Sequence, residues 1–268
     1  MKNREKLKSN LYSIAVIFFM VAMLISENVC PKFFGGIDGG DWICAALSRL
    51  FGGIACLLLI GGFLSVSFLK FNFSIRKLLI FLPCMLIAIN NFPFVTYLGA
   101  EAYINAPIQK ILLYACYCIS IGFFEEMAFR GCIFSFVLQR RGRRVIDVFW
   151  SIVISSAIFG VVHIVNMFMG ADPGATLLQI GYSFLIGGMC SIILVKTHNI
   201  WYCVILHAVY NFAGGVVPNC GGGIIWSIPE IALTAVVAIG VAVYVIYTLV
   251  KIQPGDIEGV FQKNIDSN

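Results

Sequence analysis

Long apolar segments recur along the chain, and they constrain its fold more than any other feature. Of its 268 residues, 60% are hydrophobic and only 12% are charged. Several apolar runs reach the about 20 residues that a helix needs to cross roughly 30 Å of hydrocarbon. Alternating strands of about ten residues, which build a transmembrane β-barrel, are not found. The sequence therefore predicts an all-α, polytopic membrane helix bundle in contact with lipid, with one domain over residues 1–268.

Glycine, proline and polar residues divide the apolar sequence into eight predicted transmembrane helices. These cover approximately residues 11–25, 42–69, 78–98, 108–138, 145–169, 175–195, 200–217 and 225–250. The basic N-terminus and first apolar run resemble a signal peptide, but no small-x-small cleavage pattern follows, so we expect an uncleaved first span. With eight spans, both termini lie on the same side of the membrane. Lysine and arginine are more frequent in the segments on that side, which predicts that both termini are cytoplasmic. Arg49 is expected to extend its guanidinium from the second span to the interface.

Charge and cysteine content exclude two other interpretations. The formal net charge is +5, but the cations flank apolar segments and form no contiguous basic face, so we expect no nucleic-acid partner. There are ten cysteines and no CxxC pair, which favours neither a zinc–thiolate site nor a disulfide framework. Cys30 and Cys220 lie outside the predicted spans and could form a disulfide with each other. The sequence does not establish that bond. Eight cysteines lie in or beside apolar runs, where they pack as small hydrophobic residues: Cys44, Cys56, Cys84, Cys116, Cys118, Cys132, Cys190 and Cys203.

Two adjacent glutamates and an arginine interrupt the fourth predicted span, where residues 124–131 read Phe-Glu-Glu-Met-Ala-Phe-Arg-Gly. A charge at the bilayer centre costs roughly 2.5–3.5 kcal/mol on insertion scales, so such residues usually face a partner or a cavity. On an α-helix, Glu126 and Arg130 lie about 40° apart and can pair, whereas Glu125 and Arg130 lie about 140° apart. We therefore predict that Arg130 neutralises Glu126 and that Glu125 stays available.

Three further polar side chains fall inside apolar spans. His163 lies in the fifth span, and His207 with Asn211 lies in the seventh, four residues apart and hence on one helix face. For each residue alone, an interhelical hydrogen bond, worth about 0.6–2 kcal/mol, is the favoured explanation. Together with Glu125 they need partners in hydrocarbon, and one shared, water-containing cavity is the simplest arrangement that supplies them. The third histidine, His198, is assigned a structural role in an interfacial turn.

These residue types support more than one function. A carboxylate with imidazoles can deprotonate water or bind a divalent metal that does so, and an imidazole with an amide can stabilise an oxyanion. That set fits hydrolysis of an amide bond. It also fits a proton- or ion-coupled transporter, although no inverted repeat with broken helices is evident. A non-catalytic immunity or scaffold protein that keeps these groups for packing is the third alternative, and the residues alone leave all three open.

Three motifs resemble those of the CPBP intramembrane proteases, which include the type II CAAX prenyl endopeptidases and bacterial Abi proteins. Residues 125–130 are similar to the EExxxR motif, residues 159–163 to FxxxH and residues 207–211 to HxxxN, in the order of the family. The resemblance covers residues 124–212, within a catalytic core of about 108–217. It implies an endopeptidase of the bacterial cell membrane that cuts membrane-associated peptides or proteins. CAAX-like cleavage, bacteriocin processing and self-immunity are the roles known in the family.

The resemblance also implies a role for each motif residue. Glu125 would be the general base that activates water, with help from His163. His207 and Asn211 would form the oxyanion site, while Glu126 and Arg130 would orient the groups around the reacting atoms. Members are often described as metalloproteases, which implies zinc or another divalent metal held by Glu125, His163 and His207. The sequence contains no HExxH pair, so the metal is left open.

Helix lengths create a geometric conflict for this assignment. Counted from the predicted cytoplasmic ends, His207 lies about 11 Å deep and His163 about 27 Å deep, at roughly 1.5 Å per residue. Straight, untilted helices would keep these imidazoles apart. Tilt, a kink or different helix boundaries must therefore bring them together.

Overall fold

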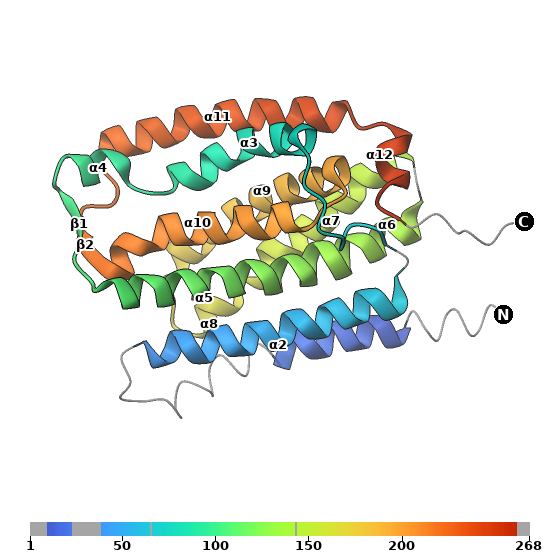
Figure 1. Ribbon diagram of the computed structural model, residues 1–268, viewed down its shortest axis with the longest axis horizontal. Helices are drawn as coiled ribbons and strands as arrows, with labels where there is room; N and C mark the ends of the chain where they lie inside the picture. The colour runs from blue at the N-terminus through green and yellow to red at the C-terminus, as the bar shows by residue number, and fades with distance from the viewer. Residues whose placement is uncertain (1–9, 23–38, 65, 143, 262–268) are drawn as a thin grey trace, which may run out of the picture.

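Long helices lie side by side along the long axis of the molecule (Figure 1). The computed structural model describes residues 10–22, 39–64, 66–142 and 144–261. Within those residues, six helices have the length and apolar composition needed to cross a membrane. They are α2 (Gly40–Phe63), the continuous helix Ile108–Arg141, the helical segment Val145–Phe168, α9 (Pro173–Thr197), α10 (Trp201–Cys220) and α11 (Ile228–Val250). The predicted all-α, polytopic membrane bundle is confirmed.

Two shorter helices lie where the sequence predicts the first and third spans. The first is Asn10–Ala22, and the second is α3 (Ile75–Asn90), which contains Pro83. At about 1.5 Å per residue, neither described helix alone reaches the roughly 30 Å of a hydrocarbon core. Pro93 lies at the break after α3 and is the N-cap residue of a separate helix, α4 (Phe94–Leu98). The third predicted span is therefore divided in two.

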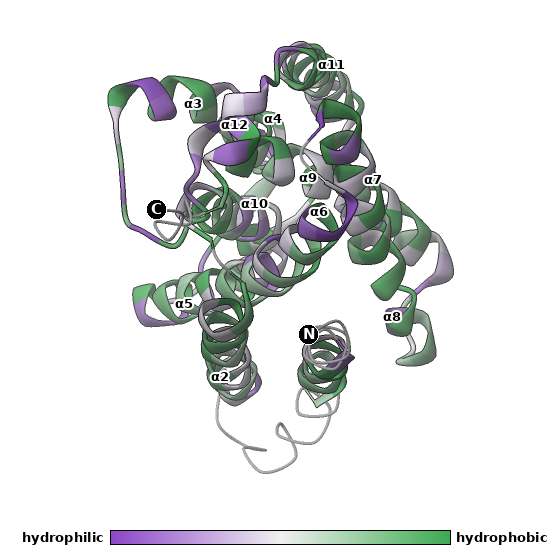
Figure 2. Ribbon diagram, turned by 90° about the vertical axis from the view of Figure 1, so that its right-hand side faces the viewer, coloured by the Kyte–Doolittle hydropathy of each residue, from purple (hydrophilic) through white to green (hydrophobic). Residues whose placement is uncertain are grey.

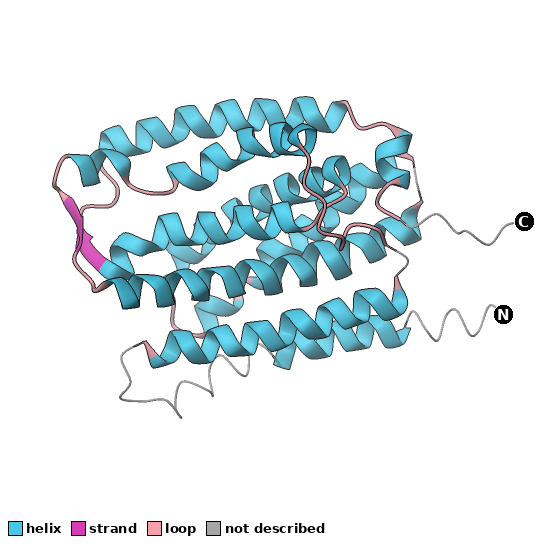
Figure 3. Cartoon of the chain, viewed as in Figure 1, coloured by secondary structure: helices cyan, strands magenta, loops and turns pink. Residues whose placement is uncertain are grey.

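The outward faces of the bundle are apolar. Viewed along the helices, hydrophobic residues cover much of α2 and α11 (Figure 2). Phe51 and Leu58 of α2 and Val236 and Ile239 of α11 are among the exposed large hydrophobic side chains. Such surfaces are suited to lipid contact. At one end, a two-stranded antiparallel sheet of β1 (Ala102–Ile104) and β2 (Gly221–Gly223) connects the approach to α5 with the end of α10 (Figure 3).

The continuous helix Ile108–Arg141 changes type in its middle. It consists of α5 (Ile108–Glu126), a π-helix η2 (Met127–Phe134) and α6 (Ser135–Arg141). The Ser135 hydroxyl donates a hydrogen bond to the Arg130 carbonyl, five residues earlier (2.9 Å), and the Tyr12 hydroxyl donates to the Cys132 carbonyl (3.2 Å). These two hydroxyl groups provide hydrogen-bond donors for backbone carbonyls of the π-helix η2. π-Helical turns are rare and occur frequently at functional sites.

Glycines allow the helices that carry the polar residues to approach one another closely. A Cβ added at Gly122 of α5 would lie 2.8 Å from the Val204 carbonyl oxygen of α10. A Cβ at Gly160 of α7 (Val145–Val162) would lie 2.8 Å from the Ile180 carbonyl oxygen of α9. These backbone approaches leave no room for a side chain, as at many helix contacts in membranes. They hold α5 against α10 and α7 against α9.

We expect Gly122→Ala to lower the free energy of unfolding by about 1–3 kcal/mol, the usual cost of overpacking a close contact. The added methyl group meets backbone atoms, which cannot rotate away. Gly61→Ala is the matched control, because a Cβ at Gly61 of α2 meets nothing within 4 Å. Chemical denaturation of both variants in detergent measures the difference. Equal stability of the two variants would contradict the close α5–α10 contact.

The turn between α9 and α10 lies inside the molecule. Thr197, Asn199 and Ile200 are fully buried, and the Asn199 side-chain amide donates a hydrogen bond to the Asn72 carbonyl (2.8 Å). The short helix α12 (Pro254–Glu258) covers this turn: Lys196 and Asp256 form an ion pair (2.8 Å), and His198 Nε2 is hydrogen-bonded to the Asp256 carbonyl (2.8 Å). By contrast, Arg140 and Arg141 at the end of α6 are exposed. His163 and His207 nevertheless line one cavity, so the straight, untilted helices that would keep them apart are not what the structure contains.

Candidate active site

The four polar residues predicted to share a cavity line the same one. A cavity of about 270 Å³ is bounded by residues of α2, α5, α7, α9 and α10, and by Met20 of helix Asn10–Ala22. Glu125, His163, His207 and Asn211 all contribute to its wall. The other polar or aromatic side chains on that wall include Arg49, Tyr117, Phe159, Asn166, Gln179, Tyr182, Ser183 and Tyr210. The cavity is large enough for ordered water and for part of an extended peptide.

Glu126 and Arg130 form the buried ion pair that their spacing predicts. Arg130 Nη1 lies 3.1 Å from Glu126 Oε1, and the two side chains are 1% and 0% exposed. The guanidinium also lies over the Phe159 ring, 4.5 Å from its centroid. A Cβ at Gly187 would lie 3.0 Å from Arg130 Nη2, so a residue without a side chain makes room for the guanidinium. The pair is closed off from solvent, where breaking it is strongly unfavourable.

His207 lies between the two glutamates. Its Nδ1 is 2.7 Å from Glu126 Oε1, and its Nε2 is 3.4 Å from Glu125 Oε2. Because an ionised carboxylate only accepts hydrogen bonds, Nδ1–H donates to Glu126. The hydrogen bond at one ring nitrogen orients the other, so Nε2 faces Glu125 and the cavity. Residue spacing within one helix pairs Glu126 with Arg130 alone and gives no signal for this link to α10.

The two glutamates differ in access. Glu125 is 19% exposed and lines the cavity, whereas Glu126 is 0% exposed and lies behind His207. His163 follows the last residue of α7, and its Nδ1 lies 2.8 Å from the Phe159 carbonyl oxygen. That carbonyl can only accept, so Nδ1 carries the proton and Nε2 is the free position of the neutral ring. The Phe159 ring contacts both imidazoles, with centroids 5.2 Å from His163 and 5.8 Å from His207.

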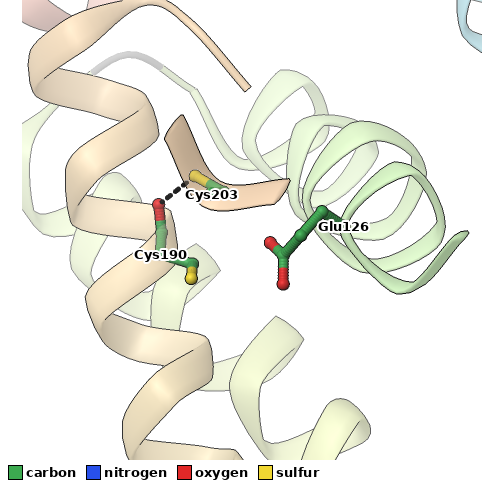
Figure 4. Close-up of side chains that lie close together, drawn as sticks. All are labelled: Glu126, Cys190 and Cys203. Atoms are coloured by element: carbon green, nitrogen blue, oxygen red, sulfur yellow. Dashed lines mark hydrogen bonds between the residues drawn. The ribbon is translucent and has the colours of Figure 1, made fainter. Parts of the chain in front are cut away.

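A metal site at Glu125, His163 and His207 is not preassembled. Among the described residues, the group with three potential ligand atoms within 4.8 Å of one another is Glu126, Cys190 and Cys203 (Figure 4). The predicted set does not meet that separation, although the hydrogen bond at His163 Nδ1 leaves Nε2 available as a ligand atom. These three residues therefore do not stand at metal-ligand separation in the arrangement described, and metal binding by them stays a prediction.

Arg49 is a cavity residue that the sequence analysis misplaced. It is only 9% exposed, and its guanidinium lies over the Tyr117 ring, 5.0 Å from the centroid, instead of reaching the interface. Tyr117, Ile121 and Glu125 follow one another at intervals of four, so one face of α5 carries all three into the cavity wall. That spacing was the signal in the sequence, but the partner helix of Tyr117 could not be inferred from it.

The amide pair Asn166 and Gln179 also escaped prediction. The Asn166 side-chain amide donates a hydrogen bond to Gln179 Oε1 (2.8 Å), and this pair links the segment after α7 to α9 beside the cavity. Asn166 follows His163 by three residues, a spacing that suits a shared helical face, but α7 has already ended there. Periodicity alone therefore gave no usable signal at this position.

Most cysteines predicted to pack in the apolar runs do so, but Cys44 and Cys116 depart from that prediction. Cys44 is disulfide-bonded, so its assignment as a packed thiol is wrong. Cys220 is a buried free cysteine, which argues against the bridge considered for it, and Cys30 lies outside the described residues. The buried free cysteines of the described helices are Cys56, Cys84, Cys118, Cys132, Cys190 and Cys203, whereas Cys116 is exposed.

Comparison with known families assigns the segment that carries the site. Residues 107–213 match the family model described as Rce1-like, the type II CAAX prenyl endopeptidases. No curated protein and no solved structure gives a significant match to the chain. The matched segment contains all seven defining residues of the EExxxR, FxxxH and HxxxN motifs, together with the helices that carry them. Over residues 107–213, the chain is therefore similar to the Rce1-like family of type II CAAX prenyl endopeptidases.

Proposed function

We propose that the chain is an intramembrane endopeptidase in which Glu125 activates the water that attacks a substrate peptide bond. One observation carries this proposal: Glu125 is a cavity-lining carboxylate, held 3.4 Å from His207 Nε2 and without an ion pair to Arg130 among the described residues. A carboxylate that accepts hydrogen bonds but is not neutralised by a cation is suited to take a proton.

Proton transfer then follows the geometry of the cavity. Glu125 takes one proton from water as the water oxygen bonds to the carbonyl carbon of the substrate. His163, with Nδ1–H held by the Phe159 carbonyl, presents Nε2 as a second acceptor for that water. The Asn211 amide is suited to donate to the oxyanion of the tetrahedral intermediate. When the C–N bond breaks, the proton on Glu125 moves to the leaving amine, and a carboxylic acid and an amine are released.

The position of His207 favours a positioning role over the oxyanion role that the family resemblance implies, because a neutral imidazole that donates from Nδ1 to Glu126 cannot also donate from Nε2. Glu126 accepts from Nδ1–H and is itself held by Arg130, so the imidazole is fixed with Nε2 beside Glu125. Nε2 can accept a hydrogen bond from protonated Glu125 during the reaction. Arg130, Glu126 and His207 thus form one buried chain that orients the base. No step in this scheme passes through a metal.

The substrate class follows from the setting of the cavity and from the family. Its wall combines these polar groups with apolar side chains such as Met20, Phe124 and Ile186. A membrane-associated peptide or protein is the substrate that suits such a site within a membrane bundle. CAAX-like cleavage near a lipid-modified cysteine is the form that the family description favours. Bacteriocin processing and self-immunity would use the same hydrolysis. The cation distribution favours cytoplasmic termini for the protein in each of these roles.

Hydrolysis in H₂¹⁸O tests the proposal directly. The purified protein, reconstituted in liposomes, is incubated with matched peptides: one CAAX-type peptide with a prenylated cysteine, the same peptide without the lipid, and a bacteriocin leader peptide. We expect mass spectrometry to show an internal cut whose new carboxylate carries ¹⁸O. Absence of labelled product from every peptide, with protein that remains folded, would exclude the proposed activity on these substrates.

A further inference from the structure

Behind the wall of the cavity, two thiols and a carboxylate meet in the core. Cys190 of α9, Cys203 of α10 and Glu126 of α5 place potential ligand atoms within 4.8 Å of one another (Figure 4). All three residues are 0% exposed. Cys203 Sγ donates a hydrogen bond to the Cys190 carbonyl (3.1 Å), so both thiols are held at the α9–α10 contact. The family motifs include Glu126 but neither cysteine.

Only one of the two carboxylate oxygens of Glu126 has a partner among the described residues. Its Oε1 contacts both Arg130 and His207, whereas Oε2 is buried and has no hydrogen-bond partner in the part of the chain that the structure describes. A buried acceptor without a partner is costly and requires an explanation. A ligand that bonds Oε2 would remove the cost, and the two thiols beside it indicate which kind of ligand this is.

Two thiolates and a carboxylate suit a soft divalent cation. Thiolates select ions such as Zn²⁺ over Mg²⁺ or Ca²⁺, and three protein ligands leave one position of a tetrahedral site open. With metal–sulfur bonds of about 2.3 Å, tetrahedral ligand atoms lie about 3.8 Å apart, so a spread of up to 4.8 Å needs only a small contraction. Two thiols lose two protons as the cation brings two charges, so the net buried charge does not change.

We propose that Glu126, Cys190 and Cys203 form a binding site for a thiophilic divalent cation, and that a cation bound there inhibits the protease. The inhibitory part rests on the proposed function. A cation bonded to Glu126 Oε2 draws negative charge from the carboxylate, so Oε1 accepts more weakly from Arg130 and His207. The hydrogen bond that directs His207 Nε2 toward Glu125 is thereby weakened. The cation is an inhibitory ligand in this scheme, bound behind the cavity and away from Glu125.

Cadmium is the probe for the site, because each Cd²⁺–thiolate bond gives an ultraviolet charge-transfer band. The reduced, purified protein is dialysed to equilibrium against CdCl₂, with time for the closed site to open. We expect one Cd²⁺ with two thiolate ligands, and a loss of affinity of about tenfold to a hundredfold in Cys190→Ser and Cys203→Ser. Cys56→Ser is the matched control, because Cys56 contacts another buried cysteine, Cys132, but no carboxylate.

Thermal unfolding provides a second measure that does not depend on activity. Cd²⁺ bound to the folded state should raise the Tm of the parent and of Cys56→Ser, but not that of Cys190→Ser. Cys190→Ala replaces the serine variant if the latter does not fold. No Cd²⁺–thiolate band in the parent, or an equal band in Cys190→Ser, would overturn the site.

The inhibition is measured with the peptide that the parent protein cleaves fastest. We expect saturating Cd²⁺ to lower kcat of the parent by at least about tenfold, in line with loss of an oriented catalytic group. Cys190→Ser should keep the cation-free activity and lose the sensitivity to Cd²⁺. Equal inhibition of both proteins would overturn the inhibitory role. If the parent cleaves no peptide, the proposed function fails, while the Cd²⁺ stoichiometry and the Tm shift still decide the site.

Discussion

Glu125→Gln should lower kcat by about 10²–10⁴-fold, the usual contribution of a general base, and leave the unfolding temperature unchanged. The amide keeps the shape of the side chain but cannot take a proton from water. Stability is preserved because Glu125 is partly exposed and has no ion pair with Arg130 within the described helices. KM should change little, since the lost interaction arises during the chemical step. Steady-state kinetics and thermal unfolding in detergent measure both quantities.

Two further variants separate catalysis from folding. Glu258→Gln removes an exposed carboxylate of α12 and should leave both kcat and Tm unchanged. Glu126→Gln removes the fully buried carboxylate that holds Arg130 and His207, so it should lower Tm as well as kcat. A kcat of Glu125→Gln within about threefold of the parent would exclude Glu125 as the base, because removing a base costs far more.

The parts of this fold that follow from local sequence were predictable. Apolar run length is a property of contiguous residues, and it predicted a helix bundle whose six long spans are observed in the described chain. The separation of four between Glu126 and Arg130 predicted their pairing, which the structure confirms. The need of polar side chains for partners in hydrocarbon predicted one cavity around Glu125, His163 and His207.

Other features depend on contacts between distant segments and had no local signal. The π-helix is supported by Tyr12, from a helix far away in the sequence, which bonds the Cys132 carbonyl. The α9–α10 turn is buried, and α12 covers it through contacts with Lys196 and His198. The bond from His207 to Glu126 requires α5 and α10 to meet at Gly122. Such pairings are set by packing, which residue spacing within one helix does not encode.

Arg130→Met should lower the free energy of unfolding by about 3–5 kcal/mol, the cost of breaking a buried ion pair from one side. Methionine fills part of the space under Phe159 but leaves the Glu126 carboxylate with His207 as its remaining partner among the described residues. The second expected effect is a loss of activity, because Glu126 then no longer holds His207 in one orientation. Unfolding in detergent and peptide cleavage measure these two effects independently.

A double variant tells a stranded charge apart from lost packing. In Glu126→Gln/Arg130→Met the carboxylate is absent, so the penalty for leaving it unpaired disappears, and we expect stability to recover most of the way to the parent. Replacing both members of a buried pair is often close to neutral, whereas removing one is not.

If packing of the guanidinium against Phe159 and Gly187 were the main contribution, the double variant would be as unstable as Arg130→Met. A coupling free energy near zero in this cycle would therefore contradict the ion pair as the source of stability. Activity should remain low in both, because the amide of the double variant holds His207 less firmly than the carboxylate does.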